Sequence, residues 1–390
     1  MNKKLSLAVA GALVAFSSVA NAGITIPAGD WTVDIGGNVN AFAVNTTNTG
    51  TGSAASSVTT AKNGVGTGLL PAQFGIGAKT RQNDLDIAFQ FSFFTGTSQG
   101  SGTNSLNIRQ AYLTFGDASW GTVLAGRNLG LYGSDVILSD MTLLGVGPIT
   151  TASVGGNATY GHIGTGYQYA DWLGQIAYTT PNFNGFQASV AVTEPYAPGT
   201  SQIGNQLGFQ GKASYDFAAN DVTGKVWVGG LQQSRNGAAT VKDTKAYELG
   251  AKLGFAGAEL VGYYYDGDAL SSVDATSATV YGAGGDIGIA AAGKVHDSKD
   301  SGGFVQATYK IPTIGTKVGV SWGSSNTKTN GDARQFESSA WTVGAYHPLT
   351  KSLSLVAEYS KSTQEVSGGS AAQNGKLEGN TVAAGAILFF

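Results

Sequence analysis

Apolar and polar residues alternate along most of this chain, and the alternation is clearest between residues 84 and 93. One face of that segment is wholly apolar: Leu85, Ile87, Phe89, Phe91 and Phe93. The other face is small or polar: Asp84, Asp86, Ala88, Gln90 and Ser92. A period of two predicts a β-strand. Because the second face carries little charge, it suits the wall of a water-filled lumen better than the surface of a soluble sandwich.

Sixteen segments of this kind follow one another. They span residues 31–44, 69–80, 84–95, 105–116, 120–127, 166–179, 183–194, 205–217, 222–233, 244–255, 257–268, 302–311, 315–326, 337–348, 351–362 and 377–390. Long connections, such as 45–68, 128–165 and 269–301, alternate with short ones, such as 81–83 and 349–350. A meander with short turns at one end produces this rhythm, and a Greek-key sandwich does not. The sequence therefore predicts an all-β protein, a 16-stranded antiparallel transmembrane β-barrel.

The first 22 residues read as a secretory signal peptide. Lys3 and Lys4 give a positive start, Leu5 to Phe16 an apolar stretch, and Ala20-Asn-Ala22 a cleavage pattern. An uncleaved anchor is the alternative, but the apolar run is short for a membrane span. No later stretch of about 20 apolar residues exists, so insertion is expected by strands. The predicted organisation is a signal peptide at 1–22 and a barrel at 23–390.

Composition excludes several classes of protein. Removal of the signal would leave 368 residues and take the net charge from −3 to −5, which argues against nucleic-acid binding. The chain has no cysteine, so disulfides, thiolate metal sites and thiol catalysis are excluded. Its 59 glycines, 8 prolines and 16 tyrosines fit many strands, tight turns and interfacial aromatic residues.

Five segments resemble motifs of the Gram-negative general porins, which are trimeric, 16-stranded diffusion channels, and most closely the β-proteobacterial type. The segments, in this order, are Asn107–Gly116, Trp120–Asn128, Tyr178–Phe186, Ala213–Phe217 and Tyr264–Asp268. The resemblance covers nearly the whole chain after residue 22. The chain also ends on an aromatic residue, Phe390, after a strand with an apolar face. In outer-membrane barrels such a residue serves as an assembly signal.

The resemblance implies a mechanism and a location. The third loop would fold into the barrel and narrow it, with acidic loop residues facing basic wall residues across the lumen. Small hydrophilic solutes and ions would then diffuse through an outer-membrane homotrimer in contact with lipids and lipopolysaccharide, without catalysis and without a cofactor. Fixed opposite charges in a narrow passage focus the field and sort solutes by charge.

Particular residues occupy the family's constriction positions. Arg109 matches the inward arginine of the fourth strand, and Arg127 stands at the base of the third loop. Asp140 matches the loop's acidic residue, with Asp135 as the second candidate. We expect Arg109 and Asp140 to face each other across the lumen; a salt bridge that merely tethers the loop to the wall is the alternative for both arginines.

The sequence also departs from the family. Gln73 and Asp171 stand where wall arginines are expected, and the loop over 141–150 is apolar and uncharged. This depleted set of basic residues predicts weak selectivity, neutral to mildly cation-preferring. Strong anion preference would require lysines such as Lys79, Lys252 or Lys310 to line the constriction.

Alternatives remain at this stage. A substrate-specific sugar or organic acid channel would need aromatic residues along the lumen. An outer-membrane enzyme or adhesin is disfavoured, because His162, His296 and His347 lie far apart and near no nucleophile motif. The glycines of 282–288 lack the β-α-β context of a dinucleotide site. Carboxylates at Asp266 and Asp268, or Asp297 and Asp300, would suit either a divalent ion or solvated loops.

Two further expectations concern the outer face. Aromatic residues near strand ends are expected to form interfacial girdles: Tyr263, Tyr264, Tyr265, Tyr309, Trp322, Trp341, Tyr359 and Phe389. On the fourth strand, Gln110 and Thr114 beside Tyr112 would make the outward face less lipid-like and suggest burial against another subunit.

Overall fold

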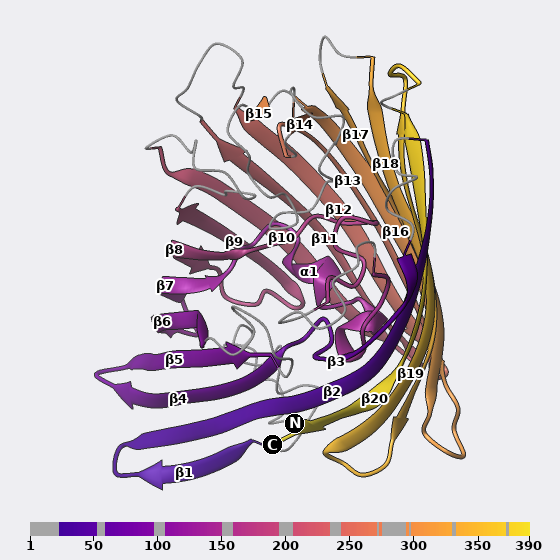
Figure 1. Ribbon diagram of the computed structural model, residues 1–390. Coiled ribbons are helices and arrows are strands. Elements are labelled where there is room, and N and C mark those ends of the chain that lie inside the picture. The colour runs from indigo at the N-terminus through magenta and orange to yellow at the C-terminus, as the bar shows by residue number, and fades with distance from the viewer. Residues whose placement is uncertain are drawn as a thin grey trace.

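The computed structural model describes residues 23–52, 59–96, 106–149, 159–194, 206–234, 243–270, 273–274, 294–295, 298–329, 333–371 and 374–390. The predicted signal peptide, His296, Asp297 and the glycines of 282–288 lie outside these residues. Within them the chain closes a 16-stranded antiparallel barrel, as predicted (Figure 1). Among the described residues no helix is both long and apolar enough to cross a membrane.

The wall is built from consecutive antiparallel neighbours. Its strands are β2 (Trp31–Gly52), β3 (Thr59–Gly66), β4 (Ala72–Gln82), β5 (Leu85–Thr95), β6 (Asn107–Asp117), β7 (Gly121–Leu129), β8 (Trp172–Thr179), β9 (Phe186–Thr193), β10 (Gly208–Ala219), β11 (Val222–Gln233), β12 (Thr244–Phe255), β13 (Ala258–Asp268), β16 (Ser298–Lys310), β17 (Lys317–Thr329), β18 (Gln335–Pro348), β19 (Leu353–Ser367) and β20 (Gly375–Phe389). The barrel closes where β20 pairs with β2, from Asn38 opposite Phe389 to Gly52 opposite Gly375. Closure leaves no open sheet edge within the wall.

The second wall strand is interrupted, which corrects the predicted boundaries. Both β3 and β4 pair with β2, so they are two halves of one strand, and residues 67–71 between them leave the ladder. We had predicted a loop at 45–68 and a strand at 69–80. These strand ends could not be predicted from an apolar stripe, because the outer parts of β2 and β3 are polar. A hydrogen-bonded ladder can continue where side chains need not face lipid.

Further elements were not predicted. Strand β1 (Ile24–Ala28) forms a hairpin with the start of β2. Two short strands, β14 (Val273–Asp274) and β15 (Lys294–Val295), pair with each other. The loop after β7 contains a one-turn helix α1 (Ser134–Ile137) and a 3₁₀ turn η3 (Met141–Leu144).

The predicted outward faces are confirmed. Apolar residues of the predicted stripes lie exposed, for example Phe91, Leu249, Val320 and Val382. Their neighbours on the inner face are buried, for example Ser92 and Glu248. The alternation predicts correctly which side chains face outward and which face inward, because each strand separates lipid from the barrel interior.

The girdle prediction is partly wrong. Tyr264, Tyr309, Trp322 and Tyr359 are exposed on the outer face, and Trp341 packs edge-on against Tyr359. In contrast, three of the predicted residues point into the barrel and are buried: Tyr263, Tyr265 and Phe389. Adjacent residues of a strand cannot all face lipid, so only the middle tyrosine of 263–265 does.

The outward face of the fourth strand was also assigned wrongly. Gln110 and Tyr112 are each 4% exposed and face the interior, whereas Leu113 and Phe115 are exposed on the outer face. The argument for a subunit contact at that strand therefore fails.

Candidate functional site

The loop that joins β7 to β8 folds into the barrel. We call residues 130–171 the inward loop; the structure describes 130–149 and 159–171 of it. Its base is closed by a hydrogen bond from the Gly130 amide to the Asp171 carbonyl, 2.9 Å. Figure 1 shows α1 and the neighbouring turns inside the wall. The inward-folded third loop is therefore present, and it extends to Asp171 instead of the predicted 165.

The first part of the inward loop is held by a charge cluster. The Asp135 carboxylate lies 2.7 Å from Lys212 Nζ and 2.5 Å from Lys225 Nζ, on β10 and β11. Burial alone would raise the pKa of Asp135, but the two ammonium groups outweigh it and lower the pKa to about 2. The predicted loop acid is thus paired with wall lysines that the sequence analysis did not single out.

Wall side chains also accept hydrogen bonds from the backbone amides that precede α1. Gln210 Oε1 accepts from the Leu131 amide at 2.7 Å, and Glu248 Oε2 accepts from the Gly133 amide at 2.9 Å. The Tyr263 hydroxyl donates to the same Glu248 oxygen at 2.8 Å. A loop without regular structure must find partners for its buried amides, and here the wall provides them.

The tip of the inward loop is fixed by Glu358 of β19. Its Oε2 accepts from the amides of Val146 and Gly147, at 2.7 and 2.8 Å, and its Oε1 accepts from the Tyr346 hydroxyl at 2.6 Å. A Cβ on Gly145 would lie 2.1 Å from Glu358 Oε1, so a larger residue there would displace this carboxylate from the loop. Gln306 of β16 adds a bond from the Met141 amide, 2.6 Å.

The returning part of the loop lies against β17. His162 Nε2 is 2.8 Å from Ser321 Oγ, and the Gly166 amide donates to Ser325 Oγ at 3.0 Å. Gly323 lies between these two serines in the sequence, and a Cβ there would lie 2.2 Å from the Thr165 carbonyl oxygen. Small residues on the inner face therefore allow the loop backbone to touch the wall.

Asp140 lies within the loop, where it organises the fold of the loop itself. Its carboxylate accepts from the Thr142 amide and hydroxyl, each at 2.8 Å, from the Tyr167 hydroxyl at 2.6 Å and from the His162 amide at 3.3 Å. The residue is 4% exposed. These bonds occupy the carboxylate that we expected to face Arg109.

The predicted arginine positions lie elsewhere. Arg109 occupies a β-bulge of β6, and its guanidinium stacks on the ring of Phe94, 4.8 Å from the centroid. No ion pair joins it to Asp140 among the described residues. Arg127 is exposed on the same face of β7 as Val123, which is the outer face of the barrel. Its side chain therefore points away from the lumen.

Gln73 and Asp171 stand where the family resemblance led us to expect wall arginines. Gln73 is buried on the inner face of β4, opposite Asn38 in the ladder. Asp171 closes the loop base with φ of 56°, and its carboxylate accepts from the Trp172 amide at 2.7 Å. Gln73 therefore contributes a neutral wall residue, and Asp171 shapes the return of the loop.

Several lysines lie on other strands of the wall. Lys252 of β12 pairs with Glu259 at 2.9 Å, and Lys79 of β4 pairs with Asp34 at 2.8 Å. Lys310 is exposed near the short turn after β16. Lys317 of β17 lies over the ring of Tyr346, 5.1 Å from its centroid, with no ion pair to a described carboxylate. Sequence spacing alone gave no reason to choose among these lysines.

Aromatic and aliphatic side chains pack inside the barrel on both sides of the inward loop. One cluster contains Phe42, Leu70, Phe94, Met141, Val146, Ile149, Trp172, Tyr346 and Phe389. The other contains Tyr132, Val136, Ile163, Tyr167, Trp227, Tyr263, Tyr265 and Phe304. Aromatic residues therefore also line the interior or pack on the loop, in addition to those on the outer face.

The described residues contain no assembled catalytic group. His162 Nε2 and Ser321 Oγ are close, but the ring Nδ1 faces the Thr165 carbonyl at 3.3 Å and Asp140 binds the His162 backbone amide. Burial lowers the pKa of His162. No group of three His, Cys, Asp or Glu residues in the described chain is arranged to hold a metal ion.

Asp300, one of the carboxylates considered for a divalent ion, is 1% exposed and accepts from the Ser298 and Thr327 hydroxyls. It therefore serves the local fold.

A closed 16-stranded barrel with an apolar outer face and a loop folded into its interior defines an integral outer-membrane β-barrel channel. Residues 8–367 match the Gram-negative porin family, and the chain belongs to that family. Its location is accordingly the outer membrane. No curated protein matches the chain.

Solved structures share the fold at low sequence identity. The anion-selective porin from Comamonas acidovorans is 16% identical, with 92% of this chain and 100% of that chain covered and a TM-score of 0.61. The outer membrane channel DcaP of Acinetobacter baumannii is 15% identical, with 95% and 100% covered and a TM-score of 0.62. Salmonella typhi OmpF, in complex with daunomycin, is 15% identical, with 94% and 100% covered and a TM-score of 0.59.

Proposed function

We propose that this porin is a general diffusion channel, through which small hydrophilic solutes and ions pass without catalysis or a cofactor. The observation that carries the proposal is the inward loop, held against the wall by Asp135, Glu248 and Glu358. A loop fixed in this way narrows a water-filled barrel, and solutes pass it by diffusion without a chemical step. The paired charges of the inner wall suit hydrated solutes of either sign.

A substrate-specific channel is the second candidate, because of the aromatic residues inside the barrel. Phe94, Trp172 and Tyr346 belong to one interior cluster, and apolar rings can bind the flat faces of sugars. Bilayer reconstitution separates the two functions. A general channel should show conductance proportional to salt concentration and unaffected by added sugars or organic acids. Saturation or block by one solute class would favour the specific channel.

For the reversal potential in a salt gradient we expect weak selectivity. The predicted range was neutral to mildly cation-preferring, and the pairing of Lys212, Lys225 and Lys252 with carboxylates supports a small net fixed charge. A permeability ratio far from one would contradict this expectation. Strong anion preference would point to Lys317, whose ammonium has no ion pair with a described carboxylate.

Arg109 remains our candidate for an accessible wall charge. Arg109→Ala should move the reversal potential towards cations, because one fixed positive group leaves a confined passage where charge acts strongly. Arg127→Ala is the matched control, since Arg127 lies on the outer face. A shift for Arg127→Ala equal to that for Arg109→Ala would contradict the placement.

We further propose a homotrimer, supported by the outer face of β20, β2 and β3. Alanines line it at Ala41, Ala43, Ala384 and Ala386, and Asn45 donates to Asn63 beside them at 2.7 Å. Amide side chains are costly against lipid and are better covered by protein. OmpT of Vibrio cholerae, 13% identical with a TM-score of 0.56, is described in a trimer form.

The trimer should be visible in gels: an unheated sample should migrate as a large β-rich species and a boiled one as a monomer. Deletion of Phe390 should slow assembly several-fold, because this residue directly follows the closing strand β20 and extends its pairing with β2 through two backbone hydrogen bonds to Gly37, at 2.9 and 3.1 Å. Pulse-chase of the heat-modifiable form measures the rate. Phe390→Tyr, which keeps the aromatic ring, should assemble normally; equal rates for deletion and parent would remove the assembly role.

A further inference from the structure

Two lysines face each other on the inner wall of the barrel, at the end that carries the short connections. Lys310, the last residue of β16, lies opposite Lys317, the first residue of β17, in the strand register. Both side chains face inward, because they alternate with the exposed outward residues Tyr309 and Val318. In a porin the short connections face the periplasm, so the pair lies in the periplasmic half of the lumen.

This pair has positive charge that the protein does not neutralise. Neither lysine forms an ion pair with a described carboxylate, and like charges directly opposite each other destabilise a sheet. The Lys317 ammonium lies over the ring of Tyr346, 5.1 Å from its centroid, and this contact holds the charged group against the wall. An anion bound between Lys310 and Lys317 would remove their repulsion.

A third lysine and one carboxylate lie beside the pair on the same inner face. Lys252 of β12 and Glu259 of β13 are partly exposed and form an ion pair of 2.9 Å. Glu259 lies opposite Thr308, which is two residues from Lys310 on the same face of β16. We call Lys252, Glu259, Thr308, Lys310 and Lys317 the vestibule patch. Its three ammonium groups and one carboxylate leave an excess of two positive charges.

The inward loop lies directly above the vestibule patch. Gly319 follows Lys317 by two residues on the same face, and a Cβ there would lie 2.6 Å from Met141 Sδ of the loop. The Met141 amide donates to Gln306, which shares its face of β16 with Lys310. The patch therefore lies just below the narrowing, where a confined passage focuses the field of fixed charges.

Other basic residues at this end of the inner wall are paired with carboxylates. Lys79 lies 2.8 Å from Asp34, and Arg81 contacts Asp86 and Asp117 at 2.9 and 2.8 Å. An anion would have to compete with a carboxylate for each of these groups. At the vestibule patch two ammonium groups are available without such competition.

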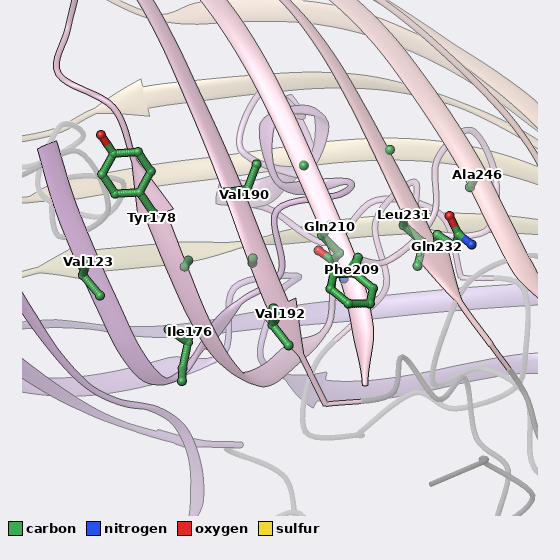
Figure 2. Close-up of a pocket in the computed structure, with 14 residues that line it drawn as sticks. Val123, Ile176, Tyr178, Val190, Val192, Phe209, Gln210, Leu231, Gln232 and Ala246 are labelled. Carbon is green, nitrogen blue, oxygen red and sulfur yellow. The ribbon is translucent and has the colours of Figure 1, made fainter. Parts of the chain in front are cut away.

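A groove on the outer face of β7 to β12, shown in Figure 2, provides a contrast. It is lined by apolar side chains such as Ile176, Val190 and Phe209, and its polar members, such as Gln210 and Gln232, are neutral. Such a surface suits acyl chains and offers an anion no positive charge. A small anion is therefore expected to bind on the inner face, which it reaches from water.

We propose that the vestibule patch binds monohydrogen phosphate. The two negative charges of this anion match the excess of two positive charges, and its oxygens can accept charge-assisted hydrogen bonds from Lys310 and Lys317. Its hydroxyl group can donate to Glu259, whereas sulfate has no hydrogen to donate and is repelled by that carboxylate. The inference deepens the proposed function and rests on it, because the anion reaches the patch by diffusion through a water-filled barrel.

The test uses the full-length protein in detergent and radiolabelled inorganic phosphate, with binding measured by equilibrium dialysis at mildly alkaline pH and low ionic strength. Lys310→Gln/Lys317→Gln should bind roughly 100-fold more weakly, at roughly tenfold for each charge-assisted hydrogen bond lost. The control is Lys299→Gln/Lys328→Gln, which removes a second pair of facing lysines from the same two strands, exposed on the outer face at their other end. That variant should bind phosphate like the parent.

Sulfate tests the role of Glu259. The parent should bind phosphate several-fold more tightly than sulfate, and Glu259→Gln, which removes the repulsion of sulfate, should bind the two anions with similar affinity. Equal binding of both anions by the parent would overturn the assignment to phosphate. Unchanged binding in Lys310→Gln/Lys317→Gln, or an equal loss in the control, would overturn the patch itself.

Planar bilayers separate this inference from the proposed channel. Added phosphate should move the reversal potential of the parent towards cations, because it neutralises the patch, and should have no such effect on Lys310→Gln/Lys317→Gln. A channel that conducts but does not bind phosphate would refute the patch and leave the diffusion channel standing. Phosphate binding without conductance would support the patch and refute the diffusion channel. Heat-modifiability of each variant reports on folding.

Discussion

Replacement of Glu358 by alanine is expected to release the tip of the inward loop. The substitution removes the acceptor of the Val146 and Gly147 amides and of the Tyr346 hydroxyl, all of which are buried. Each buried donor left without a partner costs about 1–3 kcal/mol, so the loss for the three donors together is about 3–9 kcal/mol. The expected results are a lower thermal midpoint and frequent current fluctuations in single-channel records, because the loop then occupies more than one position.

Matched variants separate the loop contact from a general loss of stability. Glu358→Gln keeps one carbonyl oxygen and should show a smaller effect on both measurements. Glu337→Ala removes an exposed carboxylate of β18 and should leave both unchanged. A quiet channel with the parental conductance in Glu358→Ala would mean that Gln306 and the apolar cluster around Met141 hold the loop without this carboxylate.

The sequence predicted the wall of this barrel well because lipid imposes a simple rule on every strand. A one-residue shift in register would move an apolar stripe, such as the one ending at Phe93 or the one with Val320 and Trp322, to the inner face. Such a shift is excluded when the outer face must be apolar. Turn residues set the short connections: Asn83 and Asp84, for instance, have φ of 48° and 62°. The local pattern was therefore enough for strands, their faces and the short turns.

The loop contacts were not predictable in the same way. Glu358 lies 211 residues from Gly147 along the chain, and Lys225 was not distinguishable from other lysines until β10, β11 and α1 were placed together. Asp140 matched a family position, yet Tyr167 and His162, which surround it, follow it by more than 20 residues. The resemblance identified the right loop, while the partners of its acidic residues depend on the three-dimensional path of the loop.

Inward-facing aromatic residues were misplaced for a related reason. Tyr263 and Tyr265 look interfacial in the sequence because they flank Tyr264 near a strand end. In the structure the Tyr263 hydroxyl binds Glu248, and the Tyr265 hydroxyl accepts from Gln168 of the inward loop at 3.0 Å. Only the presence of the loop inside the barrel makes a buried tyrosine favourable there, since the loop provides both apolar contact and polar partners.

Neutralising Asp135 is expected to give the largest change in ion selectivity. Asp135→Asn leaves Lys212 and Lys225 facing the lumen side of the loop without their shared counter-charge. The net fixed charge rises by one at a site where the field is focused, so the cation-to-anion permeability ratio should fall, by roughly twofold or more. Reversal potentials in a salt gradient measure the change.

A compensating variant tests the charge argument directly. Asp135→Asn combined with Lys225→Gln restores the charge balance and should return the reversal potential close to that of the parent. Asp221→Asn, at the short turn between β10 and β11, is the control for loss of a carboxylate away from the loop. If the double variant remained as anion-preferring as Asp135→Asn, the loop would have moved and charge alone would not explain the shift.

The pH dependence of the same cluster has a definite sign. The pKa of Asp135 is about 2 in the folded protein, because the two lysines outweigh the effect of burial, and about 3.9 in an unfolded chain. A lowered pKa means that the cluster contributes its full stability above about pH 4 and loses it as the pH falls towards 2. The difference in reversal potential between the parent and Asp135→Asn should therefore persist from pH 7 to pH 4. Disappearance of that difference near pH 5 would show that the lysines do not hold Asp135 ionised, and the proposed tether would have to be abandoned.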